Sequence, residues 1–374
     1  MVHGSTLMKS LKRRIAAGTR DFLTQGEKGC AIPSSHSVSG TESARLFAHF
    51  SSARALVLGV SGGADSSSLL WLMSRWRRDC GGPPIYALTV NHGLRPEAAA
   101  EAAAVAALAA RLGVPHEIVS WDGPRPQTGI EAAARAARYR LLSEAAARHG
   151  ASHIITAHTL DDQAETVLMR LAAGSGPSGL AAMRPLAWRG DVLHARPLLG
   201  VPRARLEATL REAGVEWCED PMNRDPAFAR PRLRAARAVL EREGLSAGRL
   251  ATLAARMARQ EDALEKVADA AWTRLAGEGE GETVFAVASL LEEPEEIALR
   301  LIGRAVERHG DGTPQRLGRL ERFVAYLLER ARTHEPAGRT LAGAQARLAR
   351  GVLRIAPAPP RKAPRGAKEA ATIL

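Results

Sequence analysis

The chain has 374 residues, enough for two or three domains, and none of its apolar runs approaches the roughly 18 residues that a membrane-spanning helix requires. Its three cysteines, Cys30, Cys80 and Cys218, are too far apart in sequence for a disulfide framework or a local CxxC metal site. The formal net charge of +12 favours a polyanionic partner, nucleic acid first, although the prevalence of arginine over lysine can also reflect biased coding composition.

The first fifty or so residues have no steady apolar periodicity. A basic stretch at 9–14 precedes a Ser/Gly-rich run from Ser34 to Ser43. We predict a loosely ordered N-terminal extension over residues 1–52, with a short helix at its end as one option. The segment has no apolar core of the kind a secretion signal carries, so a cytoplasmic location and no membrane partner are predicted.

From Ala55 the pattern changes to short apolar runs that alternate with longer Ala-rich helical segments. This alternation is typical of a parallel sheet covered by helices, so an α/β, Rossmann-like domain is predicted over residues 53–200. The predicted strands are 55–60, 85–90, 116–120 and 153–157, and the predicted helices are 67–77, 96–112 and 129–149.

After Pro202 the strand signals fade and helical periodicity dominates, which predicts a helical domain over residues 201–335 that binds tRNA or substrate. A small tail over residues 336–374 follows, with two short strands and a disordered Pro/Lys/Arg-rich end beyond Ala356. The predicted helices are 203–213, 232–243, 247–275 and 294–307, and the two tail strands are 339–341 and 352–355.

A glycine-rich bend joins the first strand to the first helix of the α/β domain. Adjacent Gly62 and Gly63 let the backbone approach a ligand, and the helix that follows directs N–H groups at an anion. No Gly-Lys-Ser/Thr follows, and the GxGxxG spacing is absent, so the Walker A and dinucleotide interpretations are excluded. The alternative is a plain turn with an aspartate cap. Ser-Gly-Gly-x-Asp-Ser over residues 61–66 resembles the PP-loop of ATP pyrophosphatases, which hold the β- and γ-phosphates of ATP.

A second polar constellation, His158 to Thr166, follows the fourth predicted strand and so lies at the sheet edge where open α/β sheets bind ligands. Asp162 and Glu165 are three residues apart and share one face of a helix, where two carboxylates can converge on a cation. Thr159 and Asp162 also have the spacing of a capping box, which is a purely structural alternative. The Gly-rich turn 174–179 is longer than a helix cap requires and favours a loop beside a site.

This stretch, with further blocks in the same order, resembles the signature of tRNA(Ile)-lysidine synthetases over about residues 54 to 355. The chain departs from the family pattern at Thr159, Met222 and Pro231, which leaves the contacts near Arg230 open. The further blocks are Asn91-His92-Gly93-Leu94-Arg95 with Glu101, Ala134-Arg135 with Arg138-Tyr139, Arg196-Pro197-Leu198-Leu199, and Asp220-Pro221 with Asn223.

The resemblance implies a ligase that uses ATP and Mg²⁺ to adenylate the wobble cytidine of the CAU-anticodon isoleucine tRNA, and then joins L-lysine to C2 of that base. Arg230, Arg234 and Arg237 recur at helical spacing, and a surface stripe is the alternative to RNA binding. The implied catalytic residues are Asp65, Asp162, Glu165 and Arg230; the ATP-binding residues are Ser61, Gly62, Gly63, Ala64, Asp65, Ser66 and His92; the lysine-binding residues are Arg138, Asp162 and Glu165; the tRNA-binding residues are Arg230, Arg234 and Arg237; and Asp65 is the Mg²⁺ ligand.

Two other functions compete with this interpretation. A tRNA sulfur-transferase of the same superfamily would need a cysteine pair or a cluster-binding CxxC, which the cysteine spacing does not provide. A basic RNA-binding protein with a degenerate nucleotide site would bind tRNA without splitting ATP. The oligomeric state is not readable from the sequence, with a dimer as one option.

Overall fold

The computed structural model describes residues 36–93, 97–121, 126, 128–219 and 225–359. Contacts between residues divide the chain into two compact units. Unit 1 contains the described residues up to Gly174 together with Ser178–Ala258, and unit 2 contains Ser175–Pro177 and the described residues from Arg259 onward. The division falls within the long helix Ala247–Leu275 and does not test the predicted domain limits at 52, 200 and 335, which stay predictions.

Unit 1 is built on a six-stranded sheet in the order β3-β2-β1-β4-β6-β5, in which only the edge strand β5 is antiparallel to its neighbour. The predicted α/β fold with a parallel sheet is confirmed. The strands are β1 (Leu56–Gly59), β2 (Ile85–Asn91), β3 (His116–Ser120), β4 (His153–Thr156), β5 (Leu186–Arg189) and β6 (Val192–Ala195).

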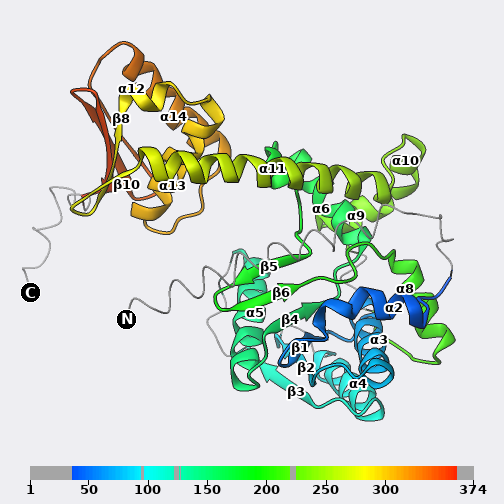
Figure 1. Cartoon of the computed structure of the whole chain (residues 1–374). Coiled ribbons are helices and arrows are strands. Elements are labelled where there is room, and N and C mark those ends of the chain that lie inside the picture. Colours follow the sequence, from blue (N-terminus) through cyan, green and yellow to red (C-terminus); the bar gives the residue numbers. More distant parts are fainter. Residues whose placement is uncertain (1–35, 94–96, 122–125, 127, 220–224, 360–374) are drawn as a thin grey trace, which may run out of the picture. The chain divides into compact units, whose positions relative to one another are not determined.

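Helices cover both faces of this sheet (Figure 1), because successive side chains of a strand point to opposite sides and both sides are apolar. Leu56 and Leu58 of β1 belong to a core with α3, α4 and α8, whereas Val57 belongs to a separate core with α5. The helices from α2 to α10 are α2 (Gly40–Phe47), the 3₁₀ turn η1 (Ala48–Phe50), α3 (Ala64–Cys80), α4 (Ala98–Arg111), α5 (Ile130–Arg148), α6 (Leu160–Ala172), α7 (Pro177–Leu180), α8 (Arg203–Glu212), α9 (Ala229–Ala235) and α10 (Arg237–Arg242), and all but the first residue of α7 belong to unit 1.

The connections reverse direction between β1 and β4. From β1 the chain winds outward through β2 to β3, then returns through α5 to β4 on the other side of β1. Such a reversal is the point at which open α/β sheets bind ligands, outside the carboxyl ends of the strands. The glycine-rich bend follows β1 and the His158 segment follows β4, so the topology brings the two predicted constellations to one place.

The described residues from 36 to 50 are anchored to α8. Arg205, which is only 5% exposed, donates to both carboxylate oxygens of Glu42 at 2.7 and 2.6 Å and to the carbonyl oxygens of His36 and Ser37. Phe47 and Phe50 are fully buried in the core of unit 1. These contacts differ from the loose extension predicted for residues 1–52, of which residues 1–35 lie outside the described part of the chain.

Replacing Arg205 by methionine should lower the free energy of unfolding of unit 1 by about 2 kcal/mol, because a buried pair is broken and Glu42 loses its partner. The matched control is Arg211→Met in the same helix, whose partner Glu207 lies at 2.9 Å but whose side chain is 61% exposed. It should change stability by less than about 0.5 kcal/mol. Urea unfolding followed by circular dichroism measures both, and equal effects would contradict the anchoring role.

Unit 2 packs its helices against a five-stranded antiparallel sheet in the order β7-β8-β11-β10-β9. Phe285, Leu301, Phe323 and Ile355 are buried in its core, which joins the helices to one face of the sheet. The elements are β7 (Gly277–Gly279), β8 (Glu282–Ala286), α12 (Val287–Leu291), α13 (Glu295–His309), α14 (Leu317–Arg332), β9 (Ala337–Leu341), β10 (Ala344–Ala349) and β11 (Val352–Pro357).

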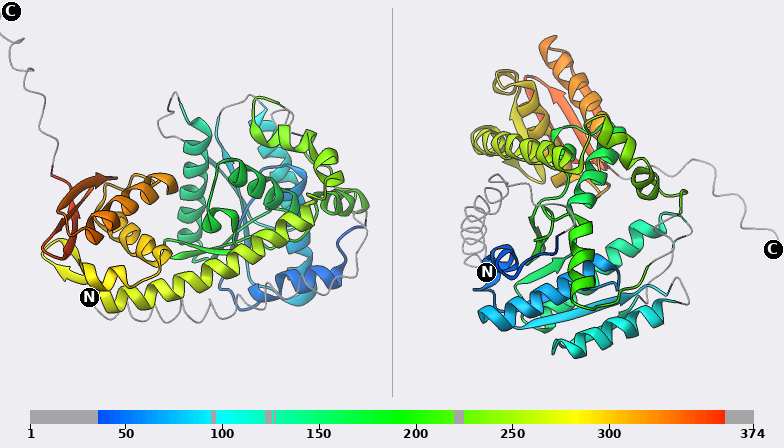
Figure 2. Two further views of the ribbon diagram at one scale, coloured as in Figure 1. Left: turned by 90° about the horizontal axis from the view of Figure 1, so that it is seen from above. Right: turned by 90° about the vertical axis from the view of Figure 1, so that its right-hand side faces the viewer.

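The helix α11 (Ala247–Leu275), whose residues up to Ala258 belong to unit 1 and whose later residues belong to unit 2, is uninterrupted and has the predicted bounds (Figure 2). The predicted helix 232–243 is wrong as one element, since the chain forms α9 and α10 with a break at Ala236. Nowhere in the described part of the chain does a helix combine the length and apolar character that crossing a bilayer requires.

Candidate active site

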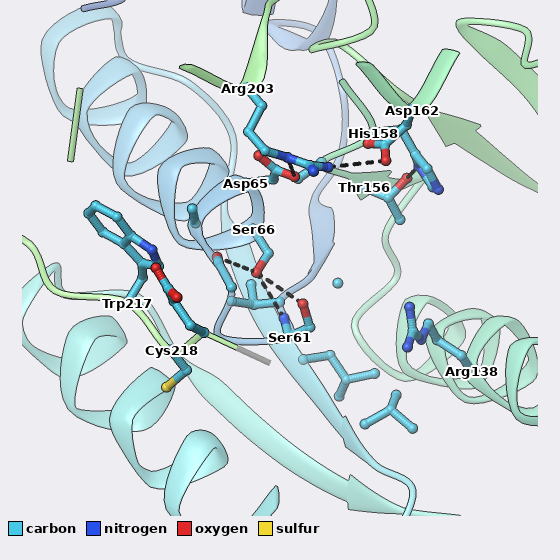
Figure 3. A pocket seen from close by; sticks show the side chains of 18 of the residues that line it. Ser61, Asp65, Ser66, Arg138, Thr156, His158, Asp162, Arg203, Trp217 and Cys218 are labelled. Atoms are coloured by element: carbon cyan, nitrogen blue, oxygen red, sulfur yellow. Dashed lines mark hydrogen bonds and ion pairs between the residues drawn. The ribbon is translucent and has the colours of Figure 1, made fainter. Parts of the chain in front are cut away.

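The bend after β1 is held by its own serines. Ser66 Oγ accepts a hydrogen bond from the backbone N–H of Ser61 at 3.1 Å, lies 3.2 Å from Ser61 Oγ and donates to the carbonyl oxygen of Gly63 at 3.1 Å (Figure 3). Gly62 has a φ of +87°, a conformation that residues with a side chain rarely adopt. Its carbonyl oxygen accepts a hydrogen bond from the backbone N–H of Cys218 at 2.9 Å, which fixes the far side of the bend.

This bend leaves the first turn of α3 open to a ligand. Gly63 is the N-cap residue and has no side chain with which to cap the helix. The unpaired N–H groups and the partial positive charge of the helix dipole therefore favour an anion at this position. The geometry of residues 61–66, called the phosphate bend below, suits an anion such as phosphate, and the ATP-binding roles predicted for these residues stay predictions.

The N-terminus of α6, unlike that of α3, is capped by side chains. Thr159 Oγ1 accepts from the N–H of Asp162 at 3.3 Å, and Asp162 Oδ2 accepts from the N–H of Thr159 at 2.9 Å, which completes a capping box. The capping box that the sequence offered as a structural alternative for these two residues is therefore present. It uses only Oδ2 of Asp162, however, and Oδ1 is directed into the site.

Arg203, in the first turn of α8, joins the two constellations. Its Nε donates to Asp65 Oδ2 at 2.9 Å and its Nη2 to Asp162 Oδ1 at 3.2 Å (Figure 3). Its backbone N–H also donates to Asp161 Oδ2 at 2.8 Å. One guanidinium therefore fixes the distance between the phosphate bend and α6, which a planar fork of donors does better than a flexible ammonium.

The two carboxyl groups that share Arg203 ionise differently. Burial raises the pKa of Asp65 to about 6, Arg203 opposes the rise, and the nearby Asp162 adds to it. Burial also works against ionised Asp162, but Arg203 and the hydrogen bonds from Thr159 outweigh it and leave its pKa below the usual value. Asp162 is therefore an anion at neutral pH, whereas a further cation beside Asp65 would stabilise its ionised form.

Three arginines of α9 and α10 meet three acids of α6. Arg234 Nε donates to Glu165 Oε1 at 2.6 Å and Arg237 pairs with Asp161 at 2.5 Å. Arg230 is more loosely held, with 3.9 Å to both Asp162 and Glu165. The predicted arginine stripe thus faces the acids. The cationic partners of Asp162 and Glu165 are guanidinium groups of the chain itself.

These groups surround a cavity of about 470 Å³ in unit 1, between the phosphate bend, α5, α6 and α8. A second cavity of about 310 Å³ shares Arg203 and Arg234 with it. The predicted site residues that line the first cavity are Ser61, Gly63, Ala64, Asp65, Ser66, Arg138, Asp162, Arg230 and Arg234; Glu165 and Arg237 line the second; Gly62 and His92 line neither.

His92 is linked to the cavity through Arg138, because Nη2 of Arg138 lies 3.4 Å from Nε2 of His92. Burial and the charge of Arg138 lower the pKa of His92 to about 4, so the imidazole is neutral and accepts this hydrogen bond. The predicted block Asp220-Pro221-x-Asn223 and residues Leu94 and Arg95 lie outside the described residues, so their predicted roles are not addressed by the geometry.

Sequence reasoning missed Arg203, Thr156, Glu207 and Cys218, all of which line the cavity. Arg203 carried a detectable signal, because a cation in the first turn opposes the helix dipole and calls for another partner. Burial and the neighbouring Glu101 raise the pKa of Cys218, so its thiol is not activated.

Comparison with known proteins agrees with this geometry. A family model described as a PP-loop domain matches residues 36–241, which contain both constellations. The tRNA(Ile)-lysidine synthases of Bradyrhizobium sp. strain BTAi1 and Rhodopseudomonas palustris are 49% and 50% identical to this chain, over 87% of it and 96% of their own length. The chain belongs to the tRNA(Ile)-lysidine synthase family. The family predicted from the sequence motifs is confirmed, as are a tRNA-modifying ligase and an ATP-binding PP-loop domain.

Among solved structures, the U34-tRNA thiolase NcsA from Methanococcus maripaludis, with its [4Fe-4S] cluster, has a TM-score of 0.50 and 18% sequence identity. The match covers 58% of this chain and 78% of the thiolase. At this identity the likeness supports the fold of a lysidine synthase family member and carries no information on its substrate.

Proposed function

We propose that this protein joins L-lysine to C2 of the wobble cytidine of the CAU-anticodon isoleucine tRNA. In the first step the C2 oxygen attacks the α-phosphorus of ATP and pyrophosphate leaves. In the second step the ε-amine of lysine attacks C2 and displaces AMP. The observation that carries the proposal is one cavity that has an uncapped helix N-terminus at one wall and Asp162 of α6 at another, in a chain about half identical to lysidine synthases.

The phosphate bend would take the β- and γ-phosphates. Their negative charge would meet the first turn of α3, and the hydroxyl groups of Ser61 and Ser66 would exchange their mutual contact for phosphate oxygens. Asp65 Oδ1 is buried and has no hydrogen-bond partner in the described part of the chain. This oxygen fits Mg²⁺, which binds through one or two carboxylates plus substrate phosphates and would offset the charge that builds up on pyrophosphate.

The anionic face of α6, formed by Asp162 and Glu165, would select lysine. Asp162 and Glu165 are both about 6% exposed, and in the described residues their charges are balanced by Arg203, Arg230 and Arg234. An ammonium group entering this site would replace the guanidinium of Arg234 at Glu165. The lowered pKa of Asp162 makes it a weak base, so we assign it to selecting the cation.

The decisive assay incubates the protein with ATP, Mg²⁺, radiolabelled lysine and a transcript of isoleucine tRNA with a CAU anticodon, and scores label covalently bound to RNA. Label in RNA, with AMP and pyrophosphate as products, is expected. Unlabelled RNA with pyrophosphate release that depends on a sulfur donor, or binding of tRNA without ATP cleavage, would support the two competing functions. The unactivated thiol of Cys218 argues against sulfur transfer at this cavity.

Replacing Glu165 by glutamine should raise the KM for lysine about tenfold, with little change in the KM for ATP, because a neutral amide attracts an ammonium less strongly than a carboxylate. The matched control is Glu144→Gln on α5, whose carboxylate pairs with Arg140 at the surface. Steady-state kinetics with lysine as the varied substrate measures the change. A lysine KM equal to that of the wild type would remove Glu165 from the lysine site.

The arginines of α9 and α10 are proposed to reach tRNA while they balance the acids of α6. Arg230 and Arg237 are 39% and 54% exposed, so each has donors available for phosphate. A cytoplasmic location stays a prediction.

A further inference from the structure

A chain of hydrogen bonds runs behind the wall of the cavity from fully buried His194 to His158. The hydroxyl group of Thr156, the last residue of β4, lies 2.8 Å from Nε2 of His194. The same hydroxyl group lies 2.8 Å from Nδ1 of His158 (Figure 3). One hydroxyl therefore connects two imidazole rings. Each ring nitrogen can donate or accept, so the direction of the chain is set by the groups at its buried end.

The buried end fixes the proton of His194. Arg196 Nη2 and Arg189 Nε lie 3.0 and 3.4 Å from His194 Nδ1, and a guanidinium can only donate. His194 Nδ1 must therefore be an acceptor. Burial and the surrounding cations lower the pKa of His194 to about 2, so the ring is neutral and its single hydrogen is on Nε2.

The same reasoning passes along the chain to the cavity. His194 Nε2–H donates to Thr156 Oγ1, and the threonine hydroxyl donates its own hydrogen to His158 Nδ1. Burial, then the charge of Arg196, lowers the pKa of His158 to about 3, so this ring is neutral as well. Its hydrogen is on Nε2. Within the described residues this N–H has no acceptor, and the ring lines the cavity.

The sheet register places this donor beside the phosphate bend. Gly59 of β1 pairs with Thr156 of β4, so Ser61 and His158 lie two residues beyond paired positions on adjacent parallel strands. Adjacent strands are about 4.8 Å apart. If the bend takes the β- and γ-phosphates, as the proposed function requires, the next group of the nucleotide is the α-phosphate.

We propose that His158 is a neutral hydrogen-bond donor to a non-bridging oxygen of the α-phosphate, oriented by Thr156 and His194 as positioning residues. When the cytidine C2 oxygen forms its bond to the α-phosphorus, the bond from that phosphorus to the oxygen bridging to the β-phosphorus breaks, and its electron pair leaves with pyrophosphate. His158 keeps its hydrogen throughout. Its contribution is a fixed dipole directed at the oxygens on which charge accumulates.

The orientation is testable without catalysis. Nitrogen-15 NMR of the protein labelled at histidine distinguishes which ring nitrogen carries the hydrogen, and His158→Gln identifies the His158 signals. The wild type should show His158 with hydrogen on Nε2, and Thr156→Ser should preserve it. Thr156→Val should give a mixture of both forms. The control Thr89→Val removes a matched threonine contact, 2.8 Å to His116 Nε2, and should alter only His116. Hydrogen on Nδ1 of His158 in the wild type would overturn the proposal.

The contact with phosphate is tested by pyrophosphate release in the presence of tRNA and lysine. His158→Leu should lower kcat about 100-fold with the lysine KM unchanged, and His158→Gln, which keeps an N–H near the position of Nε2, about tenfold. With ATP that carries sulfur at the α-phosphorus, the wild type should slow for one diastereomer, and His158→Leu should lose that discrimination. Wild-type kcat in His158→Leu, or an undiminished sulfur effect, would overturn the contact. A wild type that released no pyrophosphate would overturn the proposed function together with the contact, while the NMR result would still report on the orientation.

Discussion

Asp65→Asn is expected to reduce pyrophosphate release about 1000-fold, because the amide keeps the shape of the side chain but removes the charge at the end of the phosphate bend. Asp65 Oδ1 is buried without a partner in the described residues, and Oδ2 holds Arg203 at 2.9 Å. An asparagine carbonyl oxygen can accept from Arg203, but it binds Mg²⁺ far more weakly than a carboxylate does.

The same substitution should raise the stability of the unliganded protein, by about 1 kcal/mol at pH 8. The pKa of Asp65 is raised to about 6 in the folded protein from an ordinary value of 3.8. Its carboxyl group therefore contributes stability that is full below pH 3.8 and is lost as the pH rises through about 6. Asparagine is neutral throughout, so the advantage of the variant should grow over this window and stay constant above it.

Asp79→Asn, in the last turn of the same helix, is the matched control. Its side chain is 47% exposed and pairs with Arg75 at the surface. Its replacement should therefore change activity by less than about twofold and stability by less than about 0.5 kcal/mol. Urea unfolding at several pH values and pyrophosphate release give the two readouts. An Asp65→Asn protein that is both active and less stable than the wild type would show that Asp65 serves as a structural partner of Arg203 alone.

The topology of unit 1 was predictable because its signals are local. The strands of the sheet that carry the site, β1 to β4, are short apolar runs, and glycines end the helices between them, as Gly113 shows with its φ of +64°. The hairpin β5–β6 was missed, although Gly190 and Asp191 form a two-residue turn of the kind that joins paired strands. The helix α14 was also missed, despite apolar residues at helical spacing.

The partners of the site residues were beyond reach for a different reason. Nothing in the order of residues states that Arg203 meets both Asp65 and Asp162, or that Arg234 meets Glu165, because these contacts span 41 to 138 positions. The motif around Thr159 predicted both a capping box and a ligand site, and the structure shows Oδ2 of Asp162 in the capping box and Oδ1 on Arg203 beside the cavity. The two interpretations were therefore compatible.

Arg203→Met should have the second large effect, a loss of about 4 kcal/mol of stability at neutral pH together with about a 1000-fold loss of pyrophosphate release. The side chains of Asp65 and Asp162 are 20% and 9% exposed, and both would lose their shared cation. Lysine is a poor substitute because one ammonium does not reproduce a fork that reaches two carboxylates at once. Arg203→Lys should recover part of the stability and little of the activity.

A pH series distinguishes an electrostatic role of Arg203 from one of packing. Arg203 opposes the upward shift of the pKa of Asp65, so its removal should raise that pKa further and keep Asp65 protonated at neutral pH. The residual activity of Arg203→Met should then increase as the pH rises from 7 to 9, and its stability deficit should shrink as the pH falls and Asp65 and Asp162 become neutral. The control Arg140→Met removes an exposed pair with Glu144 on α5 and should show neither trend. A stability deficit that stays constant as the pH falls would assign Arg203 to packing, since the loss of buried apolar contacts does not depend on the protonation of neighbouring carboxylates.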